Sequence, residues 1–181
     1  MIGTPDGEPV QETREVAPDG REPLPEAREL LNRLAARGWT IGVAESLTGG
    51  LLTASIVDVP GASTRLRGAV VAYATDLKHA ILGVDAGLLA VHGPVHPDVA
   101  RQMAVGVRGV TGQDGVPADV GVSTTGVAGP SASDGHPPGT VFIGVATPAG
   151  TSVVSLLLEG DRDAIRRETV RRALRAVVEA V

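Results

Sequence analysis

Cysteine is absent from the 181 residues, and aromatic side chains are reduced to Trp39, Tyr73 and Phe142. Without cysteine the protein has no thiolate nucleophile, no thiolate-ligated zinc, no iron–sulfur cluster and no disulfide framework. Any chemistry must therefore use oxygen or nitrogen groups. Few aromatics and a net charge of −5 argue against nucleic-acid binding, which uses clustered basic side chains and often stacking platforms.

Long apolar runs are also missing. No stretch approaches the roughly 20 apolar residues that cross a bilayer, and residues 1–20 lack the basic start and apolar run of a secretion signal. We therefore predict a cytoplasmic protein that does not bind membranes. The chain length favours one domain with a substantial core.

The acidic excess lies at the N-terminus. Residues 1–29 contain eight acidic side chains and three arginines, whereas the other 152 residues contain 13 of each sign. Up to residue 23 the segment is rich in proline, glycine and glutamate with few large apolar residues, which is typical of disorder. We predict an acidic disordered tail over residues 1–23 and a single domain over residues 24–181.

From residue 24 onward, patterns typical of strands alternate with patterns typical of helices. The expected helices cover residues 24–37 and 48–57, short turns up to 82 and near 85–90, a segment opened by Pro97, and a last segment from about 161. The expected strands cover residues 40–44, 68–74, 118–124, 140–147 and 151–158, the last two joined as a hairpin. This order predicts a three-layer α/β/α sandwich whose sheet is mostly parallel, with a late antiparallel hairpin.

The first segment that could carry chemistry is Ala44-Glu45-Ser46-Leu47-Thr48-Gly49-Gly50, at a strand end and a helix start. Ligands of α/β proteins bind at the carboxyl ends of strands, and a helix N-terminus attracts anions. Here Ser46 and Thr48 supply hydroxyls, and Gly49 and Gly50 let a ligand approach the backbone. The structural alternative is that Ser46 caps the helix and the glycines make a tight turn.

The second segment contains the only lysine, because 15 of the 16 basic residues are arginine. Arginine cannot lose its proton in a protein, whereas burial can lower the pKa of lysine until it serves as a general base. Lys78 follows an expected buried strand, and the only tyrosine, Tyr73, lies five residues earlier. The alternative is an exposed lysine present by chance.

The third segment, residues 123–130, places Thr125, Gly126, Ala128 and Gly129 at another strand end. Hydroxyls followed by glycines suggest backbone donors that face a ligand, although the same residues are common in ordinary loops.

Two weaker pairs lie elsewhere. His92 and His96 have no third ligand nearby, so capping or surface positions are expected rather than a metal site. Arg162 and Arg166 lie four residues apart at the start of the last helix, where they could bind a phosphate or form a solvated charged face.

Taken together, these segments resemble the CinA C-terminal-domain family, whose characterised members include nicotinamide-nucleotide amidases. The resemblance extends from about residue 30 to residue 180. It is carried by six ordered matches: the segment 44–50; Val70-Val71-Ala72-Tyr73 with Lys78 and Leu82-Gly83-Val84; His92-Gly93 with Val95; residues 125–130; Pro138-Gly139-Thr140-Val141; and Gly160-Asp161-Arg162 with Arg166.

The resemblance implies an oligomeric α/β enzyme that hydrolyses the carboxamide of nicotinamide mononucleotide, giving nicotinate mononucleotide and ammonia without a metal or other cofactor. It also implies a catalytic dyad of Ser46 and Lys78. On this basis we expect Tyr73 to assist the dyad, and backbone N–H groups near Thr48–Gly50 or Thr125–Gly129 to stabilise the oxyanion. Arg162 is the first choice for contacting the phosphate, with Arg166 beside it.

The sequence also departs from the family pattern. Leu47 stands where the family usually has cysteine, His96 where it has serine, and residues 131–134 are less rich in glycine. The altered loop leaves an amidase for another small amide as one alternative. A non-catalytic nucleotide-binding module is the other, although such a module has no need of a deprotonable lysine.

Overall fold

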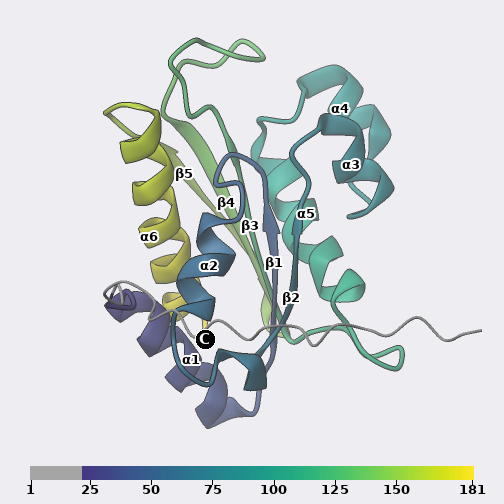
Figure 1. Ribbon diagram of the computed structural model, residues 1–181. Coiled ribbons are helices and arrows are strands. Elements are labelled where there is room, and N and C mark those ends of the chain that lie inside the picture. The colour runs from purple at the N-terminus through teal and green to yellow at the C-terminus, as the bar shows by residue number, and fades with distance from the viewer. Residues whose placement is uncertain (1–21) are drawn as a thin grey trace, which may run out of the picture.

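A five-stranded sheet forms the centre of the computed structural model, which describes residues 22–181 (Figure 1). The tail predicted for residues 1–23 lies outside the described residues up to residue 21. The strands are β1 (Ile41–Glu45), β2 (Leu66–Val71), β3 (Val120–Gly126), β4 (Thr140–Thr147) and β5 (Gly150–Leu157). The helices are α1 (Pro25–Arg37), α2 (Leu51–Val57), α3 (Thr75–Ala80), α4 (Ala86–His92), α5 (Pro97–Val110) and α6 (Arg162–Ala180), with a 3₁₀ turn at Ala62–Thr64.

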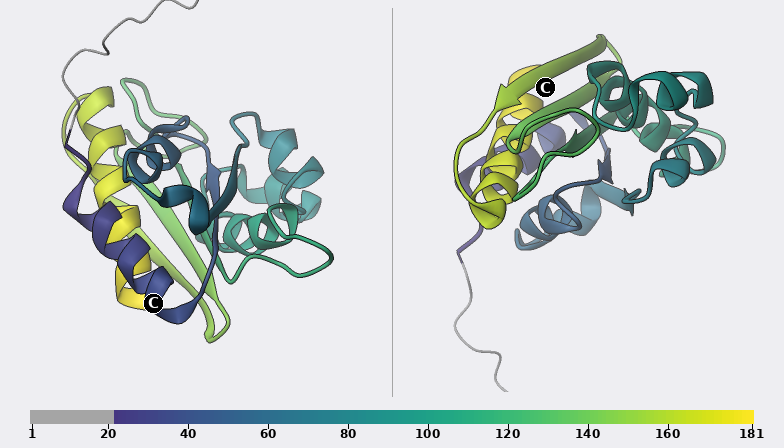
Figure 2. Two further views of the ribbon diagram at one scale, coloured as in Figure 1. Left: turned by 60° about the horizontal axis from the view of Figure 1, so that its bottom comes forward. Right: turned by 90° about the horizontal axis from the view of Figure 1, so that it is seen from above.

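The strand order is β2-β1-β3-β4-β5. β1 pairs in parallel with β2 and β3, whereas β3–β4 and β4–β5 are antiparallel. Helices α1, α2 and α6 cover one face and α3 to α5 lie on the other, as the views in Figures 1 and 2 agree. The predicted α/β sandwich with a late antiparallel hairpin is therefore confirmed.

Local sequence explains several helix boundaries. Pro25 and Pro97 occupy first-turn positions of α1 and α5, where the missing N–H has no helical partner. Gly38, with φ 68°, ends α1 in the left-handed conformation that glycine tolerates best. Asp161 caps α6 by accepting a hydrogen bond from the backbone N–H of Ala164.

Two expected elements differ from the sequence prediction. The strand predicted as buried over residues 68–74 is β2, which ends at Val71 and alternates between half-buried and exposed residues, because it forms one edge of the sheet. The helix predicted over residues 48–57 begins only at Leu51, because residues 46–50 form a turn at the end of β1.

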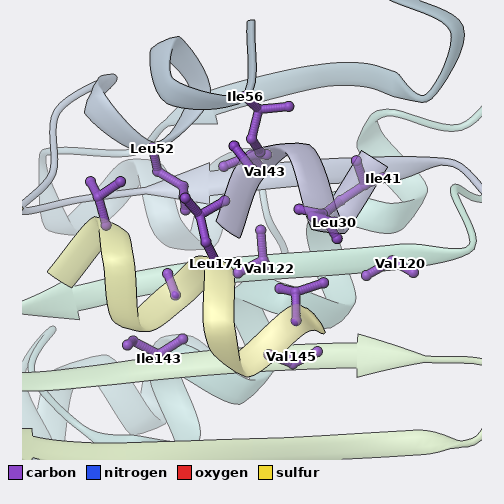
Figure 3. Packing of buried hydrophobic residues seen from close by; sticks show 14 of the residues in the cluster. Leu30, Ile41, Val43, Leu52, Ile56, Val120, Val122, Ile143, Val145 and Leu174 are labelled. Atoms are coloured by element: carbon purple, nitrogen blue, oxygen red, sulfur yellow. The ribbon is translucent and has the colours of Figure 1, made fainter. Parts of the chain in front are cut away.

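The main core fills the space between the sheet and the α1–α2–α6 layer (Figure 3). Figure 3 shows Ile41 and Val43 from β1 and Val120 and Val122 from β3, with Leu174 of α6 packed among the core side chains. A smaller cluster, which includes Ala44, Leu82, Val99, Met103 and Val107, lies on the α5 side. Among residues 22–181 we find no helix that is both long and apolar enough to cross a membrane.

Candidate functional site

A pocket of about 310 Å³ opens where β1 and β3 end, at the carboxyl edge of the parallel strands. This is the location expected for ligands in open α/β sheets, and the volume lies at the lower end of the range for small-molecule sites. Eight of the twelve predicted site residues line it: Ser46, Tyr73, Lys78, Thr125, Gly126, Ala128, Gly129 and Arg162.

A direct contact between Ser46 and Lys78 lies in this pocket. The Lys78 Nζ is 3.0 Å from the Ser46 Oγ and donates a second hydrogen bond of 2.8 Å to the carbonyl oxygen of Ala72. Ser46 follows β1, whereas Lys78 comes from α3, so residues 32 positions apart meet only in the folded chain. Lys78 is completely buried, which excludes the alternative of an exposed lysine.

Burial also changes the proton affinity of this lysine. Loss of hydration disfavours the ammonium form and lowers the pKa of Lys78 to about 8, although the negative charge of Asp134 opposes part of the shift. The neutral amine is therefore far more accessible near pH 7 than it is in a solvated lysine. A serine hydroxyl beside an amine that is readily deprotonated is an arrangement for nucleophilic catalysis.

Ser46 does not cap α2, so the capping part of that alternative is wrong, whereas Gly49 and Gly50, with φ 58° and 97°, do form the predicted turn. Glu45, which is fully buried, turns its carboxylate back onto the start of α2. It accepts hydrogen bonds from the backbone N–H groups of Gly50, Leu52 and Thr53, and from the Thr53 hydroxyl. Glu45 thus satisfies helix donors that would otherwise be orphaned, and it leaves the Ser46 hydroxyl facing Lys78.

Four predicted binding residues, Thr48, Gly49, Gly50 and Arg166, are not part of the pocket lining. The buried hydroxyl of Thr48 forms a hydrogen bond of 2.8 Å with the hydroxyl of Thr124, and the N–H of Gly50 donates a hydrogen bond to the Glu45 carboxylate. Arg166 donates to the backbone oxygens of Leu47 and Thr48 at 3.1 and 2.9 Å. These contacts position the turn that carries Ser46.

Tyr73 and Arg162 meet at the exposed side of the pocket. Arg162 donates to the Tyr73 hydroxyl at 3.1 Å and to the carbonyl oxygen of Gly129 at 2.8 Å. Tyr73 is 59% exposed, and the described residues give its hydroxyl no hydrogen bond to Ser46 or Lys78. The guanidinium group therefore links the start of α6 to the loop after β3 and to the segment after β2.

The segment after β3 forms another part of the pocket. Thr125 is buried and donates its hydroxyl hydrogen bond to the carbonyl oxygen of Pro94 at 2.7 Å, which fixes the loop between α4 and α5. Gly126 has φ 155° and Gly129 has φ 84°, conformations in which glycine is favoured. A Cβ on Gly126 would lie 2.3 Å from the carbonyl oxygen of Thr140, so this strand end admits no side chain.

Two residues of this region were missed by the sequence predictions. Asp134 belongs to the loop over the pocket, lines it, and is the only acidic residue in that lining. Glu45 accepts hydrogen bonds from the start of α2. The sequence feature that could have identified it is an acidic residue at the end of an otherwise apolar strand.

Within residues 22–181, no group of three or more histidine or acidic side chains could hold a metal ion. His92 and His96 stack with their ring centroids 4.7 Å apart. His96 caps α5 by accepting a hydrogen bond from the N–H of Asp98, and His92 is exposed, in agreement with the capping or surface positions expected for this pair.

The CinA C-terminal domain model matches residues 25–181. A CinA-like protein of Frankia casuarinae is 49% identical over 145 residues, covering 80% of this chain and 32% of that protein. A CinA-like protein of Anaeromyxobacter sp. is 45% identical over 157 residues, covering 86% of this chain and 37% of that protein. The chain thus spans about a third of the length of the curated relatives it matches.

Solved structures also match the fold. The competence damage-inducible protein A of Klebsiella pneumoniae superposes with a TM-score of 0.79 at 32% identity, covering 85% of this chain and 93% of that one. The competence/damage inducible protein CihA of Agrobacterium tumefaciens gives a TM-score of 0.77 at 30% identity, with coverages of 85% and 92%.

Proposed function

The chain belongs to the CinA C-terminal-domain family, and from this premise we propose that it is an amidohydrolase that deamidates nicotinamide mononucleotide. The products are nicotinate mononucleotide and ammonia. The observation that carries the proposal is the contact of 3.0 Å between the Ser46 Oγ and the Nζ of the buried Lys78. Ser46 is the nucleophile and Lys78 the general base, as in other serine–lysine pairs.

The hydrogen bond to Ala72 helps Lys78 to act as a base. A neutral amine keeps two N–H groups and one lone pair. When one N–H is directed to the Ala72 oxygen at 2.8 Å, the lone pair can turn toward the Ser46 hydroxyl and accept its proton. Burial supports this role, because it lowers the pKa of Lys78 toward the operating pH.

The reaction proceeds through an acyl-enzyme. Lys78 takes the Ser46 proton while the Oγ bonds to the carboxamide carbon, and the carbonyl oxygen becomes an oxyanion. The Lys78 ammonium then gives that proton to the amide nitrogen, the C–N bond breaks and ammonia leaves. Water attacks the resulting ester, one of its protons returns through Lys78 to the Ser46 oxygen, and the carboxylic acid departs and loses its remaining proton to solvent to give the carboxylate.

Donors for the oxyanion come from the pocket lining in this proposal. The N–H of Gly50 already binds Glu45. The N–H groups of Leu47 and Ala128 face no acceptor among residues 22–181, and both residues line the pocket. Backbone donors aimed at a developing negative charge are commonly worth about 3 kcal/mol of activation free energy each.

Arg162 is the proposed contact for the phosphate. It lies at the exposed side of the pocket, where its guanidinium group already bonds the Tyr73 hydroxyl and the Gly129 oxygen. Guanidinium groups bind phosphate oxygens well because of their charge and planar geometry. Arg166 instead donates hydrogen bonds to the backbone oxygens of Leu47 and Thr48 and so supports the turn that carries Ser46.

The proposal is tested by incubating the purified full chain with nicotinamide mononucleotide in the presence of a chelator, and measuring ammonia and nicotinate mononucleotide. Equal amounts of both products are expected. No product from a correctly folded sample would reject this activity. Release of ammonia only from another small amide would assign a different substrate to the same dyad.

A further inference from the structure

The loop that follows β3 carries a carboxylate into the pocket. Ser133 and His136 form an isolated antiparallel bridge around Asp134 and Gly135, whose φ angles are 52° and 77°. Positive φ at both central residues is typical of a two-residue type I′ turn. Seen from above in Figure 2, this green loop lies between α6 and the α3–α4 helices.

The turn itself does not require an acid. Asparagine followed by glycine forms type I′ turns at least as readily as aspartate followed by glycine. The chain contains a second turn of this kind, where Gln113 pairs with Val116 around Asp114 (φ 52°) and Gly115 (φ 79°). Asp114 is not in the pocket lining, so the two turns separate the conformational role of aspartate from the effect of its charge.

The position of Asp134 is defined by its neighbours. One carboxylate oxygen accepts a hydrogen bond of 2.8 Å from the Ser133 hydroxyl. The other lies 3.5 Å from the position that a Cβ on Gly93 would occupy, at the end of α4. Arg162, by contrast, begins α6 on the other face of the sheet. The pocket therefore receives a cation from one layer and an anion from a loop that touches the other layer.

We propose that Asp134 is a specificity-determining residue that selects amides on a positively charged ring, by placing its carboxylate against an N-substituted pyridinium while Arg162 takes the phosphate. This inference rests on the proposed function. The substrate in that proposal carries both charges, a cationic ring next to the carboxamide and a phosphate at the far end. Lys78, Arg162 and Asp134 are the charged side chains of the pocket lining.

A cationic ring also resolves an electrostatic conflict within the pocket. Without substrate, Asp134 opposes deprotonation of the base, because its charge raises the pKa of Lys78. A positive ring placed beside Asp134 offsets that charge and favours the neutral amine at the moment when the base is needed. A neutral ring of the same shape gives no such compensation.

The test compares two ligands on Ser46→Ala, which binds without turnover. One ligand is nicotinamide mononucleotide, and the other is its isostere 3-carbamoylphenyl C-riboside phosphate, whose ring is neutral. Dissociation constants are measured by calorimetry at pH 7 for Ser46→Ala, for Ser46→Ala with Asp134→Asn, and for Ser46→Ala with Asp114→Asn. The asparagine keeps the turn in each case, and thermal unfolding confirms that the variants are folded.

At low ionic strength, Asp134→Asn is expected to weaken binding of the cationic ligand roughly 3- to 5-fold, the effect of losing one solvated charge pair about 5 Å apart. Binding of the neutral isostere should not change. The difference should shrink at about 0.5 M salt because of screening. Asp114→Asn should affect neither ligand.

Equal effects of Asp134→Asn on both ligands, or no effect on either, would overturn the inference. If the unsubstituted protein still converts nicotinamide mononucleotide, that result leaves the proposed function standing. If it neither binds nor converts that substrate, the proposed function fails and the inference fails with it.

Discussion

At the scale of single residues, the lysine that is unique in the composition is also fully buried beside the pocket. Lys78 is the only buried residue of α3, and its two hydrogen bonds join the end of β1 to the segment after β2. An arginine could supply the charge but not a lone pair at neutral pH. The proposed role of Lys78 as a general base would therefore account for the lysine at this position in a chain whose other basic residues are arginine.

The pKa of Lys78 predicts how activity depends on pH. Below pH 8 the ammonium form dominates and only a small fraction of Lys78 can act as the base. We therefore expect kcat/KM to rise about tenfold per pH unit and to level off above pH 8. Steady-state rates from pH 6 to pH 9.5 measure this. Asp134→Asn should move the midpoint to lower pH, because that substitution removes the charge that raises the pKa of Lys78.

Lys78→Arg provides the control for this profile. Arginine keeps the positive charge but stays protonated over the whole range, so we expect activity to be lost at every pH while circular dichroism is unchanged. A normal rate in this variant, or a flat profile in the unsubstituted protein, would contradict the role of Lys78 as the base.

At the scale of elements, glycines in the sheet allow α5 to lie close to it. A Cβ on Gly121 of β3 would lie 2.0 Å from the carbonyl oxygen of Ala104, and one on Gly144 of β4 would lie 2.3 Å from that of Ala100. The Ser123 hydroxyl uses this proximity to donate a hydrogen bond of 2.6 Å to the Ala100 oxygen. α5 is thus seated directly on the strands whose ends form the pocket.

Gly121→Ala is expected to destabilise the fold by at least about 2 kcal/mol, because the added methyl group overlaps the backbone of α5 and forces the helix away. Denaturant unfolding measures the change. Gly109→Ala is the matched control, since a Cβ there meets nothing within 4 Å and alanine favours the helix by up to about 1 kcal/mol. Equal stability of both variants would contradict the close packing of α5.

The β1–α2 connection shows how one element positions another. Glu45 holds the N-terminus of α2, and Arg166 of α6 holds the backbone of Leu47 and Thr48. The turn that carries Ser46 is therefore fixed from both ends. Because residues 48–50 belong to this turn, α2 is shorter than the sequence pattern predicts.

At the scale of the whole molecule, the pocket joins both helical layers. Arg162 reaches it from α6, Lys78 from α3, and Ser46 from the end of β1 between them. The hydrogen bond of Arg162 to Tyr73, 89 positions away in the chain, closes one side. The pocket therefore depends on the complete sandwich rather than on one local motif.

The sequence predicted much of this arrangement. Alternating periodicities and Pro or Gly boundaries identified the sandwich. Hydroxyls and glycines at strand ends, the single lysine and the family resemblance together identified eight residues of the pocket. It did not show that β2 is an edge strand, because strand order is a long-range property. It ranked Arg162 before Arg166 for the phosphate, but it did not show that Arg166 lies outside the pocket lining, since which guanidinium faces the pocket depends on how α6 docks.

The central claim is that Ser46 is the nucleophile of an amide hydrolysis, and the most direct test is turnover of nicotinamide mononucleotide by Ser46→Ala. Alanine removes only the oxygen that bonds to the substrate carbon. We predict that ammonia release falls at least about 10³-fold while the substrate still binds and the unfolding temperature stays close to that of the unsubstituted protein. Ammonia release near the unsubstituted rate would contradict the account and assign the attack to water.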